Sequence, residues 1–163
     1  MKKNLFLVCL FMFGTLASCQ CSSKKSADNA VVNTTETPVP LGDPFILLHD
    51  GVYYAYGTHS NKGIEFYTSD DLLTWKYGGL ALNKEDSWAD RWFWAPEIYF
   101  VNGKFYMYYS ADEHICVAVA DSPTGPFVQD KKEPMIADEK CIDNSLFIDD
   151  NGTPYLSFVR FND

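Results

Sequence analysis

Two aspartates, Asp43 and Asp143, introduce apolar segments of similar sequence, "DPFILLHDG" and "DNSLFIDDNG". An aspartate before proline, as Asp43 is, commonly marks a turn or the start of a strand, because proline pushes the preceding residue toward extended geometry. Two carboxylates held by one fold can instead divide acid and base chemistry between them. Which of these applies depends on the elements that position the two side chains.

The apolar residues come in short runs separated by Asn-Gly and Asp-Gly pairs. The segments "FILLHDGVYYAYGT", "EIYFVNGKFYMYYS" and "LFIDDNGTPYLSFV" each predict a strand, a tight turn and a second strand. No segment sustains the 3.6-residue period of an amphipathic helix. We therefore predict an all-β protein.

The three predicted hairpins are copies of one another. Counted from Asp43, Ala95 and Asp143, the turn glycine follows after eight, eight and nine positions, and the copies recur 52 and 48 residues apart. The intervening segments "GIEFYTSDDLLTWKYGG" and "HICVAVADSPTGPFVQD" each predict two more strands. A four-stranded unit repeated about every 50 residues is typical of a β-propeller blade. Both aspartates should then lie where the first strand of a blade reaches the propeller centre.

The predicted propeller is incomplete. Residues 41–163 suffice for two blades and the first hairpin of a third, whereas closure generally needs at least four blades, on the order of 200 residues. We expect the chain to be the N-terminal part of a longer protein. Self-assembly of partial propellers is the alternative.

The N-terminus is predicted to be an export signal. Two lysines precede an apolar run at 5–16, and "LASC" follows, which resembles the lipobox at which bacterial lipoproteins are cut and lipidated. We expect a signal peptide over 1–18, lipidation of Cys19 and a flexible tether over 19–40. The alternative is an ordinary secretory signal. Either places the mature protein outside the cytoplasm, and the first places it at the periplasmic or outer-membrane surface.

The charge argues against a nucleic-acid-binding protein, and the cysteine spacing argues against a zinc site. Residues 1–40 hold four lysines against two acids, so the net charge of −9 leaves −11 for residues 41–163. A domain with this negative charge does not attract nucleic-acid phosphates. Cys116 and Cys141 lack the spacing of a zinc site, and either a disulfide or two buried thiols is compatible with the sequence. We expect no metal and no cofactor.

Four motifs carry a family resemblance. "GDPFILLHDGVYYAYGT", "FWAPEIYFVNGKFYMYYSA", "DSPTGPF" and "IDNSLFIDDNGTPYLSF" resemble the opening blades of glycoside hydrolase family 43, which includes β-xylosidases, α-L-arabinofuranosidases and arabinanases. The resemblance runs from about residue 41 to residue 163. It implies that the complete protein is a five-bladed β-propeller. It also implies an inverting glycosidase that acts on arabinose- or xylose-containing plant cell-wall polysaccharides or oligosaccharides. A carbohydrate-binding propeller without catalysis is the alternative.

The resemblance also implies roles for individual residues. Asp43 matches the general base, and Asp143 matches the residue that raises the pKa of the acid and orients it, with Asn144 where proline is common in the family. The family's acid is a glutamate, commonly before Gly-Pro, and no glutamate of this chain precedes Gly-Pro. We therefore expect residues 1–163 alone to be inactive. Glu97, of the Ala-Pro-Glu motif, is expected to support the substrate-binding funnel.

Aromatic residues gather in "WADRWFWAPE". The segment holds four aromatic rings, those of Trp88, Trp92, Phe93 and Trp94. Such rings commonly pack within or between blades, and we expect at least two of the four to do so. Aromatic faces also stack on sugar rings, so Trp94 and Trp92 are candidate substrate-binding residues.

Overall fold

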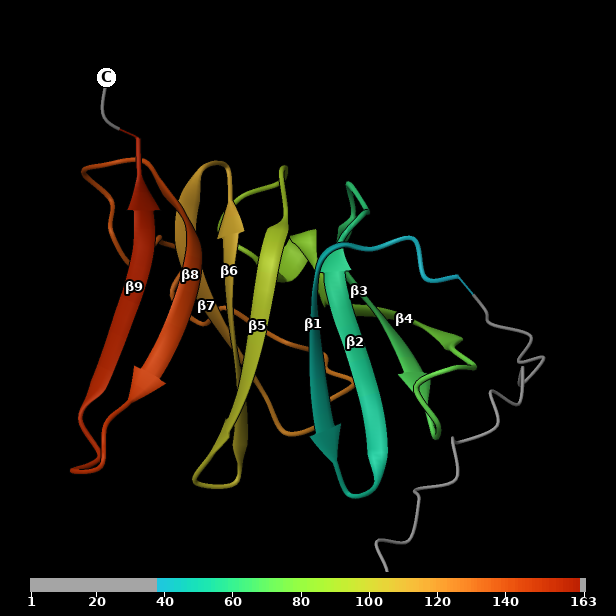
Figure 1. Cartoon of the computed structure of the whole chain (residues 1–163). Helices are drawn as coiled ribbons and strands as arrows, with labels where there is room; N and C mark the ends of the chain where they lie inside the picture. The colour runs from blue at the N-terminus through green and yellow to red at the C-terminus, as the bar shows by residue number, and fades with distance from the viewer. Residues whose placement is uncertain (1–37, 162–163) are drawn as a thin grey trace, which may run out of the picture. The chain divides into compact units, whose positions relative to one another are not determined.

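The computed structural model describes residues 38–161, which form three antiparallel sheets (Figure 1). The strands are, sheet by sheet, β1 (Gly42–His49), β2 (Val52–Thr58), β3 (Gly63–Ser69) and β4 (Lys76–Asn83); β5 (Trp94–Val101), β6 (Lys104–Ala111) and β7 (His114–Ala120); β8 (Cys141–Ile148) and β9 (Pro154–Arg160). One short 3₁₀ helix, η1 (Lys84–Asp86), follows β4. The all-β prediction is confirmed, and so are the three hairpins.

The predicted signal peptide, Cys19 and nearly all of the predicted tether lie outside the described residues. Within 38–161, no helix is long and apolar enough to cross a membrane.

The first two hairpins close through turns of the same kind. Asp50 and Gly51 have φ of 49° and 80°, and Asn102 and Gly103 have φ of 50° and 79°. Positive φ at both central residues defines the type I′ turn, whose twist matches that of the flanking strands. The Asp-Gly and Asn-Gly pairs therefore form the tight turns that the sequence predicts.

The third hairpin has a longer turn than the other two, and its turn glycine follows the left-handed residue after nine positions instead of eight. Asp149 Oδ1 accepts hydrogen bonds from the N–H groups of Asn151 (2.9 Å) and Thr153 (2.8 Å). These bonds, the one from Thr153 foremost, favour the ionised carboxyl and lower the pKa of Asp149. Asp71 caps the turn after β3 in the same way. Both acids therefore stabilise turns.

Each sheet's first strand begins with the same backbone irregularity. Asp43, Ala95 and Asp143 have φ of 44°, 43° and 54°, and the strand pairing shifts register at each of them. This is a β-bulge with a residue in the left-handed region, repeated three times. The equivalence of these three positions, predicted from turn spacing, is confirmed in the backbone.

The second sheet departs from the prediction of four strands. The segment predicted to close it forms isolated bridges only, with Val128 pairing with Val119 of β7. Pro126 has no N–H to donate, and the N–H of Phe127 donates instead to the carbonyl of Ala81 on β4 (2.8 Å). A full fourth strand does not form because this segment divides its hydrogen bonds between two sheets.

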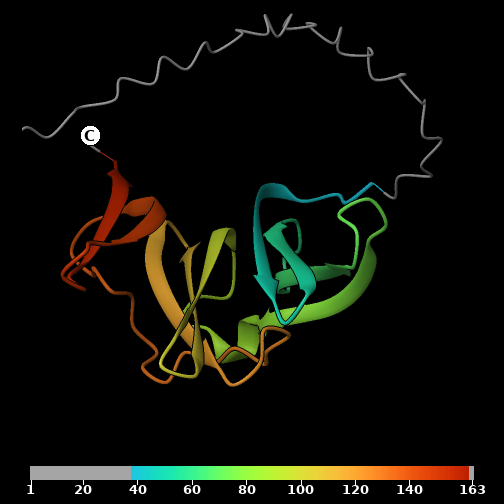
Figure 2. The same cartoon turned by 60° about the horizontal axis from the view of Figure 1, so that its bottom comes forward.

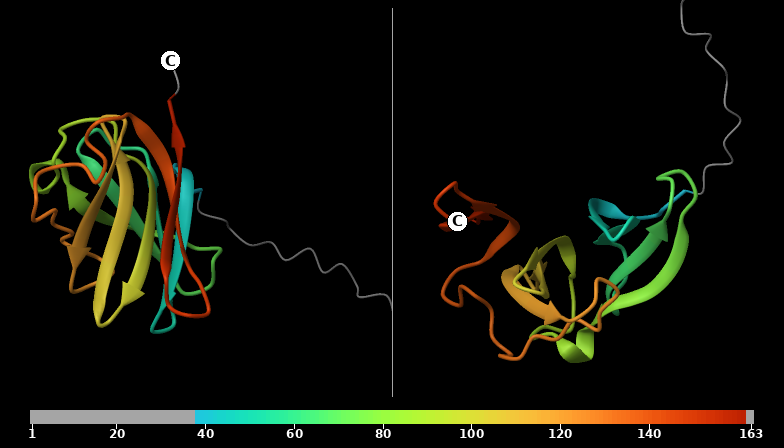
Figure 3. Two further views of the ribbon diagram at one scale, coloured as in Figure 1. Left: turned by 90° about the vertical axis from the view of Figure 1, so that its left-hand side faces the viewer. Right: turned by 90° about the horizontal axis from the view of Figure 1, so that it is seen from below.

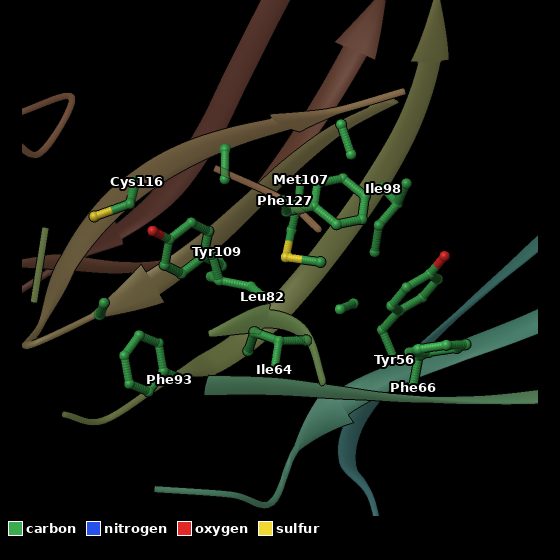
Figure 4. Close-up of a cluster of buried hydrophobic side chains, with 14 of the residues drawn as sticks. Tyr56, Ile64, Phe66, Leu82, Phe93, Ile98, Met107, Tyr109, Cys116 and Phe127 are labelled. Carbon is green, nitrogen blue, oxygen red and sulfur yellow. The ribbon is translucent and has the colours of Figure 1, made fainter. Parts of the chain in front are cut away.

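A hydrophobic core fills the space between the first two sheets (Figure 4). Its largest fully buried side chains come from both sheets and from the segments that join them: Tyr56, Ile64, Leu82, Phe93, Ile98, Met107, Tyr109 and Phe127. The Tyr109 hydroxyl is hydrogen-bonded to Ser87 (2.8 Å) and to Gln129 (3.0 Å). A buried tyrosine is tolerated when its hydroxyl has such partners.

Cys116 and Cys141 are both buried and both free. Of the two alternatives left by the sequence, the structure has the buried thiols. Burial, which disfavours the thiolate, raises the pKa of Cys116 to about 12. This thiol is therefore inert at neutral pH while the fold is intact.

The three sheets stand next to one another in chain order (Figures 2 and 3). Their first strands are neighbours, since β1 contacts β5 and β5 contacts β8. The three bulges, one at the beginning of each first strand, are thereby brought together.

Candidate active site

The three bulges line one cavity of about 280 Å³. Its walls are three equivalent tripeptides, Asp43–Phe45 of β1, Ala95–Glu97 of β5 and Asp143–Ser145 of β8. Of these strands, β1 contacts β5, and β5 contacts β8. The fold therefore places Asp43 and Asp143 at the same cavity, although the sequence separates them by 100 positions.

Asp43 is exposed at this cavity, and among the described residues its carboxylate has one hydrogen-bond partner. Its Oδ2 accepts a hydrogen bond from the Thr58 hydroxyl on β2 (3.0 Å). At the equivalent point of the second sheet, Ala95 adopts almost the same backbone φ without any carboxylate. The bulge itself does not require an acid, so a role of Asp43 in chemistry explains its presence better than backbone geometry does.

Asp143 is also exposed, and its backbone is anchored to the second sheet. Its N–H donates to the Ser110 hydroxyl on β6 (3.2 Å). Within residues 38–161 its carboxylate forms no ion pair. It stays available to a group from elsewhere that lines the same cavity.

Glu97 lies half-buried between the two aspartate positions. It accepts a hydrogen bond from the Tyr99 hydroxyl, which in turn accepts one from the N–H of Leu146 on β8 (3.0 Å). Burial and, after it, the bond to Glu97 raise the pKa of Tyr99, so this hydroxyl remains a donor. Glu97 is thus held in the cavity wall by a residue that also connects the second and third sheets.

Trp92 and Trp94 stack on each other with ring centroids 5.8 Å apart and an interplanar angle of 11°. Arg91 lies over Trp92, 4.3 Å from its ring centroid, and pairs with Asp112 at 2.7 Å. The two indoles are not among the residues that line the cavity, but Trp94 directly precedes Ala95, which does. Neither predicted substrate-binding tryptophan therefore forms part of the cavity wall.

The other two rings of this cluster are packing residues. Phe93 belongs to the hydrophobic core, and Trp88 packs against that core with its ring edge-on to His114. This matches the expectation that at least two of the rings serve packing.

Three residues of the site escape sequence reasoning. Tyr99 gives no signal, because tyrosines are frequent on these strands. Thr58 and Ser110 each lie fifteen positions after the left-handed residue of their own sheet. A comparison of hydroxyl residues across the repeats would have found them.

A search of known protein families matches residues 35–163 to the glycosyl hydrolases of family 43. The chain belongs to family 43. The match covers all three sheets and includes the cavity.

Relatives in this family are named as xylosidases, arabinosidases and arabinofuranosidases. The chain is 40% identical to a xylosidase/arabinosidase of Humicola insolens over 75% of its own length and 44% of the relative's. It is 27% identical to an extracellular exo-α-(1→5)-L-arabinofuranosidase of Cellvibrio japonicus over 76% of its length and 41% of the relative's.

A solved structure confirms the fold. The crystal structure of an endo-1,4-β-xylanase from Bacteroides thetaiotaomicron matches with a TM-score of 0.72 and 52% identity, over 76% of this chain and 44% of the other. The chain thus spans less than half the length of the family 43 relatives it matches.

One residue of this family 43 cavity is poorly accommodated. Asn144 is 3% exposed, and within residues 38–161 neither its Oδ1 nor its Nδ2 has a hydrogen-bond partner. The equivalent residues of the first two sheets are Pro44 and Pro96, and Pro96 is fully buried. An unpaired buried amide destabilises the fold, since each unsatisfied group costs about 1 to 3 kcal/mol.

We expect Asn144→Pro to raise the free energy of unfolding by about 1 to 3 kcal/mol. The substitution removes both unpaired atoms, and the bulge accepts proline at this position in the other two sheets. Urea unfolding of the chain measures the change. Asn144→Ala removes the amide without restricting the backbone and should give part of the gain. A loss of stability in both variants would show that the amide has a partner in solution.

Proposed function

We propose that this family 43 protein is an exported glycosidase that hydrolyses arabinose- or xylose-containing plant polysaccharides or oligosaccharides with inversion of configuration. The observation that carries the proposal is the placement of Asp43 and Asp143 at equivalent bulges of neighbouring sheets, around one cavity. The names of the relatives support the two sugars.

In the proposed mechanism, Asp43 is the general base. It takes a proton from water as the water attacks the anomeric carbon, while a carboxylic acid on the opposite side protonates the leaving oxygen. Such an acid and base are typically about 6.5 to 9.5 Å apart, which leaves room for the water. The Asp143 carboxylate forms no ion pair within residues 38–161. It supplies a negative charge that keeps a neighbouring acid protonated near neutral pH.

No glutamate of this chain matches the general acid of the proposed mechanism. None of its glutamates precedes Gly-Pro, and Glu97 is engaged by Tyr99 in the cavity wall. We propose that the acid comes from a further blade, and that residues 1–163 alone hydrolyse little or nothing.

We further propose that the protein is exported and held at the cell envelope by lipids on Cys19. The sequence "LASC" supports the anchor, and the Cellvibrio japonicus relative is named as extracellular. Labelling with a radioactive fatty acid, lost in Cys19→Ser, tests it.

The decisive experiment measures sugar release from a panel of arabinans, xylans and their oligosaccharides. It compares residues 1–163 with a protein extended through the downstream reading frame. Release by the extended protein alone, with the inverted anomer seen first by proton NMR, is the expected result. Turnover by residues 1–163 that is abolished in Asp43→Ala would refute the need for a later acid. Glycan binding without release by the extended protein would favour a non-catalytic binding propeller.

A further inference from the structure

One hydrogen bond recurs between neighbouring sheets. The Thr58 hydroxyl accepts from the N–H of Ala95 (3.0 Å), and the Ser110 hydroxyl accepts from the N–H of Asp143 (3.2 Å). In both cases a hydroxyl on a sheet's second strand holds the left-handed residue of the next sheet. The contact therefore connects each bulge to the sheet before it.

Within the part of the chain that the structure describes, the Thr58 hydroxyl also contacts a carboxylate and the Ser110 hydroxyl does not. Thr58 donates its single hydroxyl hydrogen to Asp43 Oδ2 at 3.0 Å. Because its oxygen accepts from the Ala95 N–H, a lone pair is occupied and the hydrogen is directed toward Asp43. The result is a chain of two hydrogen bonds from the Ala95 backbone through Thr58 to Asp43.

Ser110 provides the comparison within the same molecule. In its own sheet, the residue equivalent to Asp43 is Ala95, which has no carboxylate to receive the Ser110 hydrogen. The hydrogen bond between Ser110 and the next sheet therefore forms without a carboxylate at the Ala95 position. Thr58 makes the same contact with the next sheet and also donates to Asp43.

We propose that Thr58 is a positioning residue for Asp43. It fixes the carboxylate in one rotamer and occupies Oδ2, so that Oδ1 faces the water to be deprotonated. The inference rests on the proposed function, in which Asp43 is the general base. An exposed aspartate on a bulge has little else to orient it, and poor placement of a reacting group lowers the rate steeply.

The first test needs no hydrolysis. The full chain, labelled with ¹³C and ¹⁵N and purified in detergent micelles, reports the Asp43 rotamer through three-bond couplings from Cγ to the backbone nitrogen and carbonyl carbon. We expect a single rotamer in the wild type and in Thr58→Ser, and averaged couplings in Thr58→Val and Thr58→Ala. Ser110→Ala should leave the Asp43 couplings unchanged and speed amide exchange at Asp143 instead.

Either of two results overturns the proposal: averaged Asp43 couplings in the wild type, or a single rotamer that persists without the Thr58 hydroxyl. Averaged couplings in the wild type would overturn the proposal even where a variant fails to fold.

The second test applies to the protein form found to hydrolyse glycosides. Loss of a hydrogen bond to a charged group predicts a fall in kcat of about 10-fold to 100-fold in Thr58→Val, with KM changed by less than about threefold because ground-state binding is kept. Thr58→Ser should restore kcat. A rise in KM at constant kcat, or no rescue by serine, contradicts a positioning role. Absence of hydrolysis in the wild type would refute the proposed function and leave the coupling result standing.

Discussion

Asparagine in place of Asp43 is expected to lower kcat by about 10²-fold to 10⁴-fold, the usual contribution of a general base. The substitution is nearly isosteric, and asparagine tolerates the left-handed conformation found here, with φ of 44°. It removes the ability to accept a proton while the bulge and the Thr58 contact are kept. The measurement is initial-rate hydrolysis of an aryl xyloside or arabinofuranoside by the catalytically active form.

Asp50→Asn is the matched control for Asp43→Asn. Asp50 lies in the same hairpin, also has a positive φ, and is exposed in the turn, away from the cavity. Its replacement should leave kcat and the free energy of unfolding nearly unchanged. Equal losses of activity in the two variants, or a loss in Asp43→Asn that follows a loss of folded protein, would contradict the assignment of the base.

The repeating parts of this fold could be predicted because each depends on local sequence. Asp-Gly and Asn-Gly pairs at a constant distance from Asp43 and Ala95 set the turns, and alternating apolar residues set the strands. Comparing the copies then identified Asp43 and Asp143 as equivalent, and the structure places both at one cavity. Spacing alone was enough because a propeller repeats one unit about a common centre.

The features that sequence reasoning missed depend on contacts between sheets. The Thr58 hydroxyl acts on Ala95, 37 positions later, and Tyr99 reaches the backbone of Leu146, 47 positions later. The unpaired amide of Asn144 arises from what surrounds it, which no local pattern encodes. The partners of such residues follow only from the packing of one sheet on the next.

The missing fourth strand of the second sheet has the same origin. The alternation in "HICVAVADSPTGPFVQD" predicts a closing strand, but the chain after Gly125 pairs with both β7 and β4. Pro126 cannot donate to a ladder, and Phe127 donates to the neighbouring sheet. This segment therefore joins the first and second sheets instead of completing one of them.

Gly125 allows that junction to form, because its backbone lies very close to β4. It has φ of 80°, and a Cβ at this position would lie 2.2 Å from the carbonyl oxygen of Ala81. The same carbonyl accepts the N–H of Phe127 (2.8 Å). A side chain on Gly125 would thus push away the acceptor that joins the two sheets.

Gly125→Ala is expected to lower the free energy of unfolding by about 2 to 5 kcal/mol, from the left-handed conformation together with the steric overlap. Gly103→Ala isolates the first of these terms, because Gly103 has φ of 79° and nothing within 4 Å of its Cβ position. It should cost about 1 to 2 kcal/mol. Urea unfolding of the chain measures both, and amide exchange at Phe127 should accelerate in Gly125→Ala only. Equal destabilisation by the two alanines would mean that the approach to Ala81 contributes nothing, and that the sheets are joined by their apolar core alone.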